Sequence, residues 1–261
     1  MIVAGCDVGS LTTKAVILNR KSILGQAIIS STFRPEESAR EVMDTALASS
    51  GLSMKDIEFC VGTGYGRDRI PFVGKAVSEI ACHAKGSQWL MPSVRTVVDI
   101  GGQDCKAIKL DARGNVLKFF TNDKCAAGTG RFLEVMAKIL GVSLNELGQL
   151  SAQAKNPLHL ASTCTVWAQA EVIHHLNAKM SKADIASAIN QAMSGRVAIL
   201  ARSVGIEKDV CMTGGVAKNI GVVASLEKLL NVTIRRLKVD PQLIGALGAA
   251  VFARERMEGA S

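Results

Sequence analysis

The chain of 261 residues is 48% hydrophobic and carries a formal net charge of +8, so it can form one large domain or two lobes with a buried core. It contains no run of about 18 apolar residues, and its start lacks the basic segment and apolar core of a signal peptide. We therefore expect a cytoplasmic protein with no membrane partner. Basic residues are scattered and aromatic residues make up only 4%. This argues against a nucleic-acid partner, because single-strand binders need a stacking platform.

The first half begins with an apolar strand, residues 2–6, which leads into the segment 7–14, Asp-Val-Gly-Ser-Leu-Thr-Thr-Lys. Turn-type residues between apolar runs then predict a hairpin. Pro35 and Gly51 are typical of the start and the stop of a helix. The further elements expected here are strands over 15–18, 23–30 and 57–63, and helices over 39–50 and 74–90.

The second half repeats this order. Residues 99–106, Asp-Ile-Gly-Gly-Gln-Asp-Cys-Lys, match residues 7–14 at the Asp, Gly and Lys positions, and they too follow an apolar run. The later elements expected are strands over 107–110, 115–120, 209–213 and 232–237, and helices near 130–140, 165–178, 182–204, 218–230 and 242–257. The predicted fold is α/β with two duplicated lobes, residues 1–92 and 93–241.

Both repeated segments place Asp-x-Gly at the end of a strand. Such a turn can face phosphate oxygens with amides and hydroxyls, while its carboxylate holds hydrated Mg²⁺ or orients water. One turn would indicate little, but two related by duplication can hold a polyphosphate from opposite sides of a cleft. A third Gly-rich turn, residues 210–216, leaves room for a nucleobase or ribose. The sequence thus predicts ATP binding, with purely structural turns as the alternative.

Two of the seven cysteines stand apart. Cys125 and Cys164 each precede a helical run, so we expect both thiols at helix N-termini, where the helix dipole favours a thiolate. Ser and Thr residues beside Cys164 are expected to cap its helix. Two thiolates complete a cubane cluster only if a two-fold axis brings the same pair from a second chain. A [4Fe–4S] cluster, a zinc site across the dimer and no metal all stay open.

The other cysteines are interpreted as packing residues. The spacing includes no CxxC pair, which argues against a disulfide framework or a single-chain metal motif. Small buried apolar residues are expected at Cys6, Cys60, Cys82 and Cys211. Cys105 lies inside the second Asp-containing turn, where loop packing is favoured over ligation.

The three turns, in this order, resemble those of the actin, Hsp70 and sugar-kinase superfamily of ATPases. The resemblance implies two actin-like (ribonuclease H-like) ATPase lobes around a nucleotide cleft, with the C-terminal helix, about 242–261, joined to the first lobe. It also implies that Asp7 and Asp99 serve Mg²⁺ and the attacking water, and that the lobes close around the nucleotide. For Gln103 and Asp104, positioning of water or Mg²⁺ is favoured over turn capping.

Longer strings resemble the activator ATPases of 2-hydroxyacyl-CoA dehydratases and benzoyl-CoA-type reductases. The matching strings are residues 63–67, 99–104, 122–132, 162–166, 212–217 and 245–250. The resemblance implies a homodimer with one [4Fe–4S] cluster held by Cys125 and Cys164 of each subunit, and ATP/ADP and Mg²⁺ as further cofactors. It implies delivery of a low-potential electron to an iron–sulfur enzyme such as a 2-hydroxyacyl-CoA dehydratase, with ferredoxin or flavodoxin as the upstream donor.

The resemblance also assigns site residues. Catalytic roles fall on Asp7, Asp99, Gln103 and Asp104. The residues expected to contact nucleotide are Gly9, Ser10, Thr12, Thr13, Lys14, Gly101, Gly102, Lys106, Gly128, Thr129, Gly130, Gly214, Gly215, Val216 and Gln242.

The chain departs from the family pattern just after Cys164, where Gln169 and Ala170 replace a carboxylate and a hydroxyl. This departure leaves the electron acceptor open. A benzoyl-CoA-type reductase and a double-cubane-cluster reductase are alternative acceptors. A small-molecule kinase and a nucleotide or metal sensor are alternative functions on the same fold.

Overall fold

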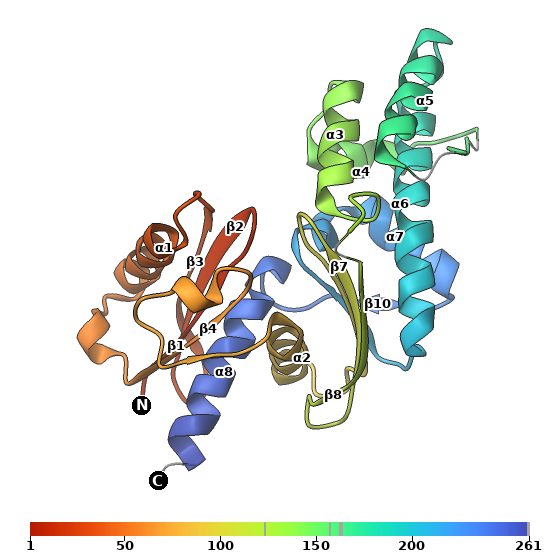
Figure 1. Ribbon diagram of the computed structural model, residues 1–261. Coiled ribbons are helices and arrows are strands. Elements are labelled where there is room, and N and C mark those ends of the chain that lie inside the picture. The colour runs from red at the N-terminus through yellow and green to blue at the C-terminus, as the bar shows by residue number, and fades with distance from the viewer. Residues whose placement is uncertain (123, 157, 162–163, 260–261) are drawn as a thin grey trace. The chain divides into compact units, whose positions relative to one another are not determined.

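The computed structural model describes residues 1–122, 124–156, 158–161 and 164–259 (Figure 1). The chain divides into two compact units. The first contains Met1–Val97, Lys109–Leu117 and Leu237–Ser261, and the second contains Val98–Ile108 and Lys118–Arg236.

The first sheet has five strands in the order β3-β2-β1-β4-β5. Its strands are β1 (Val3–Val8), β2 (Thr12–Leu18), β3 (Ile23–Ser30), β4 (Phe59–Thr63) and β5 (Lys75–Ala76). β1 runs antiparallel to β2 and parallel to β4. Every residue of β1 is buried, as expected for a central strand covered on both faces.

The second sheet repeats this topology, with the order β10-β9-β6-β7-β8. Its strands are β6 (Thr96–Ile100), β7 (Cys105–Leu110), β8 (Val116–Asn122), β9 (Val210–Thr213) and β10 (Ile234–Arg235). β6 therefore corresponds to β1, β7 to β2 and β9 to β4. The shared strand order confirms the duplication predicted from the repeated Asp-Gly-Lys pattern.

Eight α-helices accompany the sheets in the described part of the chain (Figure 1). They are α1 (Pro35–Ser50), α2 (Glu79–Leu90), α3 (Gly130–Leu140), α4 (Leu144–Ser151), α5 (Thr165–Asn177), α6 (Lys182–Val204), α7 (Ile220–Leu230) and α8 (Ile244–Gly259). None of these helices is long and apolar enough to cross a membrane.

The alternation of side chains along β1 explains how the first sheet is covered. Ala4 and Cys6 pack in one apolar cluster with Val42 and Met43 of α1. Val3, on the opposite face, packs in another cluster with α8. Successive strand side chains point to opposite faces, so α1 and α8 cover different sides of this sheet.

Local sequence signals account for several boundaries. α1 begins with Pro35 in its first turn and ends at Gly51, which has a left-handed conformation with φ 68°, as expected for helix stops. Side chains close both hairpins. Asn19 Oδ1 accepts the amides of Lys21 and Ser22, and the carboxylate of Asp111 takes the same role between β7 and β8.

Three sequence predictions differ from the structure. The helix expected over 74–90 begins only at Glu79, where the Ser78 side chain caps it, and Lys75–Ala76 instead pair with β4. α4 was not predicted, although a capping box formed by Ser143 and Glu146 marks its start. The strand expected over 232–237 is only Ile234–Arg235.

Glycines let β1, α2 and α8 pack at backbone contact distance. A Cβ at Gly248 of α8 would collide with the Cys82 carbonyl of α2, and one at Gly86 of α2 would collide with the Ile244 carbonyl of α8. Gly5 of β1 likewise faces the backbone of α8. No side chain fits between these elements, so the crossing tolerates only glycine at these positions.

We expect Gly248→Ala to lower the free energy of unfolding by about 1–3 kcal/mol, because overpacking forces backbone shifts. Gly195→Ala in α6 is the matched control. No atom lies within 4 Å of a Cβ at Gly195, so the higher helix propensity of alanine should stabilise that variant by up to ~1 kcal/mol. Urea unfolding measures both changes, and equal midpoints would contradict the close crossing.

Candidate nucleotide and metal-binding site

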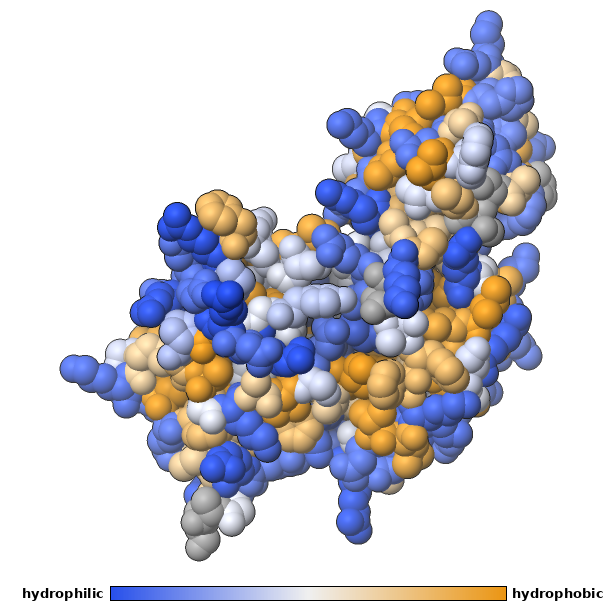
Figure 2. Space-filling model, viewed as in Figure 1, coloured by the Kyte–Doolittle hydropathy of each residue, from blue (hydrophilic) through white to orange (hydrophobic). Residues whose placement is uncertain are grey.

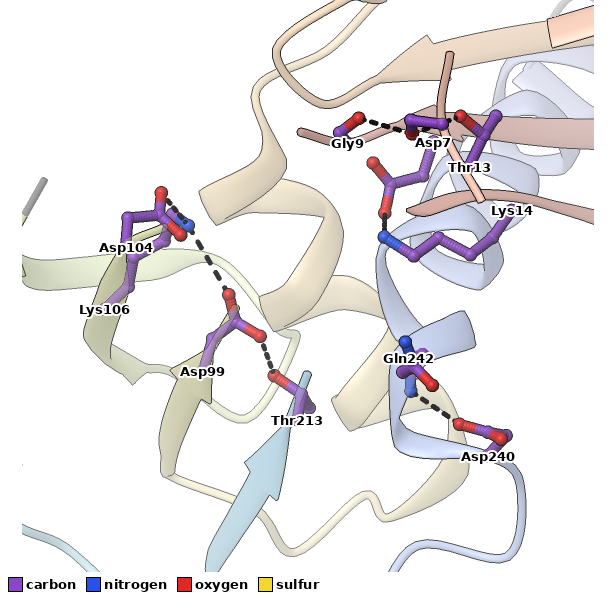
Figure 3. A network of polar contacts seen from close by, with 11 residues as sticks. Asp7, Gly9, Thr13, Lys14, Asp99, Asp104, Lys106, Thr213, Asp240 and Gln242 are labelled. Atoms are coloured by element: carbon purple, nitrogen blue, oxygen red, sulfur yellow. Dashed lines mark hydrogen bonds and ion pairs between the residues drawn. The ribbon is translucent and has the colours of Figure 1, made fainter. Parts of the chain in front are cut away.

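The first candidate carboxylate lies at the end of β1 (Figure 3). Asp7 is only 5% exposed, and Lys14 Nζ donates to Asp7 Oδ2 at 3.2 Å. The hairpin register places Asp7 directly opposite Lys14, so the spacing of Asp and Lys in the repeat follows from strand pairing. A buried carboxylate requires such a countercharge.

The turn between Asp7 and Lys14 is tight and braced. Gly9 N donates to Thr12 O at 3.1 Å. Ser31 Oγ, directly after β3, donates to Gly9 O at 2.8 Å and lies 2.9 Å from Thr13 Oγ1. Ser10, at the tip, is exposed. The predicted nucleotide contacts of this segment therefore form one turn, with Thr13 and Ser31 supporting it from below the tip.

The second carboxylate, at the end of β6, has two partners of different kinds (Figure 3). Lys106 Nζ lies 3.5 Å from Asp99 Oδ2 and 2.6 Å from Asp104 Oδ2. Thr213 Oγ1 donates to Asp99 Oδ1 at 2.7 Å. All four side chains are buried. Two carboxylates thus share one ammonium group here, whereas Lys14 is bonded to the single carboxylate of Asp7.

A third element is also duplicated. Thr63 ends β4 and Thr213 ends β9. The glycine that follows each strand, Gly64 or Gly214, has a positive φ value, 87° and 80° respectively. A Cβ at Gly64 would collide with Asp7 Oδ1, and one at Gly214 would lie 3.0 Å from Asp99 Oδ1. Each glycine therefore makes room for the carboxylate of the neighbouring strand.

The two Thr-Gly turns differ in one hydrogen bond. Thr213 donates to its carboxylate, whereas the buried Thr63 hydroxyl has no well-formed hydrogen bond within the described residues. Its neighbour is the Cys82 thiol, a weak hydrogen-bonding group, whose pKa burial raises to about 12. Asp99 is thus held on both oxygens, a constraint that Thr63 does not impose on Asp7.

The start of α3 is bonded to the second turn. Gly130 N donates to Gly101 O at 2.8 Å, and Arg131 N donates to Gly102 O at 2.9 Å. A Cβ at Gly130 would lie 3.1 Å from Gly101 O and 3.6 Å from the Val216 side chain. The structure therefore brings together the predicted segments 101–102, 128–130 and 214–216, which are far apart in sequence.

Neighbouring predicted residues have different environments. Gln103 is exposed, whereas Asp104 is buried against Lys106. A role of either residue in positioning water or Mg²⁺ stays a prediction. Gln242 lies in a short 3₁₀ turn, where its amide donates to Asp240 Oδ1 at 3.0 Å. This turn precedes α8 in the first unit (Figure 3).

The cysteines separate by accessibility, and all seven lie in the described ranges without a disulfide. Cys164 is exposed and Cys125 is partly exposed, while the other five are buried. Burial raises the pKa of Cys60 to about 12 and that of Cys105 to about 11. Burial also raises the pKa of Cys6 well above its usual value. These three thiols therefore keep their protons and are poor metal ligands.

The expectation that both accessible thiols occupy helix N-termini is wrong for Cys125. Cys164 is the N-cap residue of α5. The N-cap of α3 is Thr129, so Cys125 lies in the preceding loop, where Asn122 Nδ2 donates to its carbonyl at 3.1 Å. The loop continues through Ala126-Ala127-Gly128. Gly128 has a positive φ of 122°, which is not a helical conformation, so α3 starts only after it. Ser162 and Thr163, expected to cap α5, lie outside the described residues.

No three His, Cys, Asp or Glu side chains form a metal site within the residues that the structure describes. The candidate metal ligands are the two accessible cysteines, Cys125 in the loop before α3 and Cys164 at the start of α5. A [4Fe–4S] cluster is held by four thiolates, so these two cysteines fit such a cluster only if further thiolates come from another chain.

Sequence reasoning missed several neighbours of the site. His83 of α2 is buried, and no sequence motif places it near Asp7. A Cβ at Gly245 of α8 would lie 3.1 Å from His83 Nε2 and 2.8 Å from Asp7 Oδ2. Arg196 of α6 contacts the Cys125 thiol. Both histidine and arginine come from helices distant in sequence, so no local motif marks them.

The model of the BadF/BadG/BcrA/BcrD ATPase family matches residues 4–253. A curated relative, the activator of lactoyl-CoA dehydratase from Anaerotignum propionicum, is 46% identical over 255 residues, which are 98% of each chain.

Solved structures agree with these matches. (R)-2-Hydroxyglutaryl-CoA dehydratase component A from Acidaminococcus fermentans is 41% identical with a TM-score of 0.95, covering 99% of each chain. The activator of 2-hydroxyisocaproyl-CoA dehydratase from Clostridium difficile with bound ADPNP is 42% identical with a TM-score of 0.95, covering 100% of this chain and 97% of that one.

A ROK family glucokinase from Streptomyces griseus shares only the fold, with 13% identity, a TM-score of 0.57, and coverage of 98% of this chain and 100% of its own. The expected two-lobe α/β ATPase fold is confirmed by these likenesses and by the duplicated sheets. The chain belongs to the BadF/BadG/BcrA/BcrD ATPase family.

Proposed function

We propose that the protein is an ATP-hydrolysing electron donor that acts as a homodimer and activates an iron–sulfur 2-hydroxyacyl-CoA dehydratase. Cys125 and Cys164 of each copy would hold one shared [4Fe–4S] cluster. One observation carries the proposal: of the seven cysteines, all within the described residues, these two are the ones that are not buried. The loop of Cys125 also leads into the backbone hydrogen bonds at the Asp99 turn.

The nucleotide part of the proposal rests on the paired carboxylates. Asp7 and Asp99 each end a central strand, and each is neutralised by a lysine of the adjacent strand. A Mg²⁺–nucleotide complex supplies both cation and phosphate oxygens, so it can replace the carboxylate–lysine contacts with carboxylate–Mg²⁺ and lysine–phosphate contacts. In this way each carboxylate–lysine pair would provide one group that binds Mg²⁺ and one that binds phosphate.

The cluster part rests on the thiols. A cubane takes four thiolates, and when bound it supplies a centre that accepts and releases an electron. Cys164 at the N-cap of α5 experiences the positive end of the helix dipole. The Cys125 loop is held by Asn122 at its carbonyl and by Thr129 Oγ1, which donates to Ala126 O at 2.7 Å. These two hydrogen bonds fix the backbone of the loop that carries the Cys125 thiol.

Coupling between nucleotide and cluster would run through the start of α3. The amides of Gly130 and Arg131 donate to Gly101 and Gly102, whose turn follows Asp99. Cys125 lies only a few residues before these amides. We propose that movement of the Asp99 turn on hydrolysis displaces the Cys125 loop through these bonds, because the turn and the loop share them.

Exposed apolar side chains beside Cys164 support association with a second copy. Val166 and Trp167 of α5 are 67% and 69% exposed, and Ile173 lies two turns further along the helix. Figure 2 shows hydrophobic surface over α3 and α5 among hydrophilic side chains. Such residues are usually covered in an assembly. A dimer formed near Cys164 would bring two pairs of thiols together.

The acceptor and the donor are part of the same proposal. The activators in the comparisons are named for lactoyl-CoA, 2-hydroxyglutaryl-CoA and 2-hydroxyisocaproyl-CoA dehydratases, so a dehydratase of this class is the proposed acceptor, with ferredoxin or flavodoxin upstream. Gln169 and Ala170 lie on α5 shortly after Cys164, where an altered charge affects partner choice. Cytoplasmic location stays a prediction.

The assignment of ligands is tested by single substitutions in protein purified without oxygen. Cys125→Ser and Cys164→Ser should each lose most of the iron, because a cubane needs every thiolate, while ATP binding persists. Iron analysis, absorption spectra and nucleotide titration measure these properties.

Cys105→Ala is the matched control for the cysteine variants, since Cys105 is buried beside the same loop at Gly128. It should keep about four irons per dimer, the number in one cubane. Full iron content in both serine variants would overturn the ligand assignment.

The role of Thr213 is tested by Thr213→Val. Loss of the donor to buried Asp99 should cost about 1.5–3 kcal/mol of stability, as for hydrogen bonds to charged groups, and should reduce ATP hydrolysis by misorienting the carboxylate. Thr63→Val is the control for stability, because its hydroxyl makes no comparable bond and an isosteric apolar replacement is nearly neutral. Equal stability losses in urea would contradict the difference between the two turns.

The overall activity is tested by mixing the anaerobic protein with a 2-hydroxyacyl-CoA dehydratase and a chemical reductant. The dehydratase should become reduced and active with ATP but not with ADPNP, whose β–γ bridge resists hydrolysis. Absorption spectroscopy follows the reduction. An iron-free protein that phosphorylates an added small molecule would instead establish the kinase alternative.

A further inference from the structure

The side chain of Arg196 contacts the sulfur of Cys125. It lies in α6, and its Nη1 donates to Cys125 Sγ at 3.6 Å, a normal length for a hydrogen bond to sulfur. The backbone of the Cys125 loop also lies near this residue, since a Cβ added at Gly128 would be 3.6 Å from Arg196 Cβ. The start of the loop and its end at Gly128 are therefore both close to Arg196.

The guanidinium group is incompletely paired. Arg196 Nε is buried, and no described residue accepts a hydrogen bond from it. A buried N–H of an arginine is unfavourable without an acceptor. The guanidinium is a rigid plane with donors on more than one side, and the side that carries Nη1 faces the Cys125 sulfur.

We propose that Arg196 is a positioning residue for the iron–sulfur group, fixing Cys125 Sγ and placing a permanent positive charge beside it. The inference rests on the proposed cluster function. It adds a residue from α6 to a site that otherwise comes from the α3 loop and the start of α5.

The charge has a definite effect on electron transfer. A positive charge beside the group favours the state that carries an additional electron, and hydrogen bonds to sulfur act in the same direction. Arg196 therefore raises the reduction potential of the cluster and makes its loading by an upstream donor easier. Neutral substitution should lower that potential while leaving the carboxylate turns intact.

The test compares anaerobically reconstituted parent protein with Arg196→Gln, Arg196→Lys and Arg202→Gln. Arg202 lies on the same helix and donates instead to the Leu229 carbonyl, so it controls for loss of an arginine from α6. Iron content, ATP binding, the electron paramagnetic resonance spectrum of the reduced protein and the midpoint potential are measured for each.

We expect Arg196→Gln to shift the one-electron reduction equilibrium at least tenfold toward the oxidised form, a change of about 59 mV. Arg196→Lys, which keeps the charge but loses the planar fork, should shift it less, and Arg202→Gln should match the parent. If Arg196→Gln fails to hold iron yet binds ATP as the parent does, the positioning role is also supported.

Equal midpoint potentials in the parent and Arg196→Gln would overturn the inference while leaving the cluster in place. Loss of both iron and ATP binding in Arg196→Gln, with Arg196→Lys showing the parent potential, would indicate a purely structural role and also overturn it. A parent protein that takes up no iron would refute the proposed function itself, and the role of Arg196 with it.

Discussion

Asp7 and Asp99 are charged groups buried at the ends of the central strands β1 and β6, and burial of a carboxylate is tolerated only with a countercharge and hydrogen bonds. Strand pairing meets the first requirement by setting Lys14 opposite Asp7. The carboxylates also need space, and the glycines after β4 and β9 provide it, because a side chain at either position would press on the carboxylate. The site geometry follows from keeping these two charges inside the fold.

The duplicated units satisfy this constraint differently. In the second unit Thr213 and Lys106 hold the two oxygens of Asp99, and Asp104 shares the lysine. In the first unit Asp7 shares the space beside Gly245 with a buried histidine. Duplication thus supplied two equivalent carboxylates, and later divergence gave one of them a more rigid setting.

The second unit also connects this charged turn to the accessible cysteines. The first amides of α3 need acceptors, as all helix starts do, and they find them in the carbonyls of Gly101 and Gly102. The same chain segment carries Cys125, whose thiol meets Arg196. A helix N-terminus that would otherwise be hydrogen-bonded to water therefore links the turn of Asp99 to the thiol loop.

The sequence by itself determined the duplication, the hairpins, most helices and the separation of Cys125 and Cys164 from the buried cysteines, because periodicity, turn residues and repeated spacing are local signals. It failed at the start of α2, at α4 and at the position of Cys125 relative to α3, where short segments compete and tertiary contacts decide. Only the tertiary structure brought Arg196 to the Cys125 sulfur and Thr213 to Asp99, since such contacts join residues far apart in sequence and depend on how whole helices and strands pack.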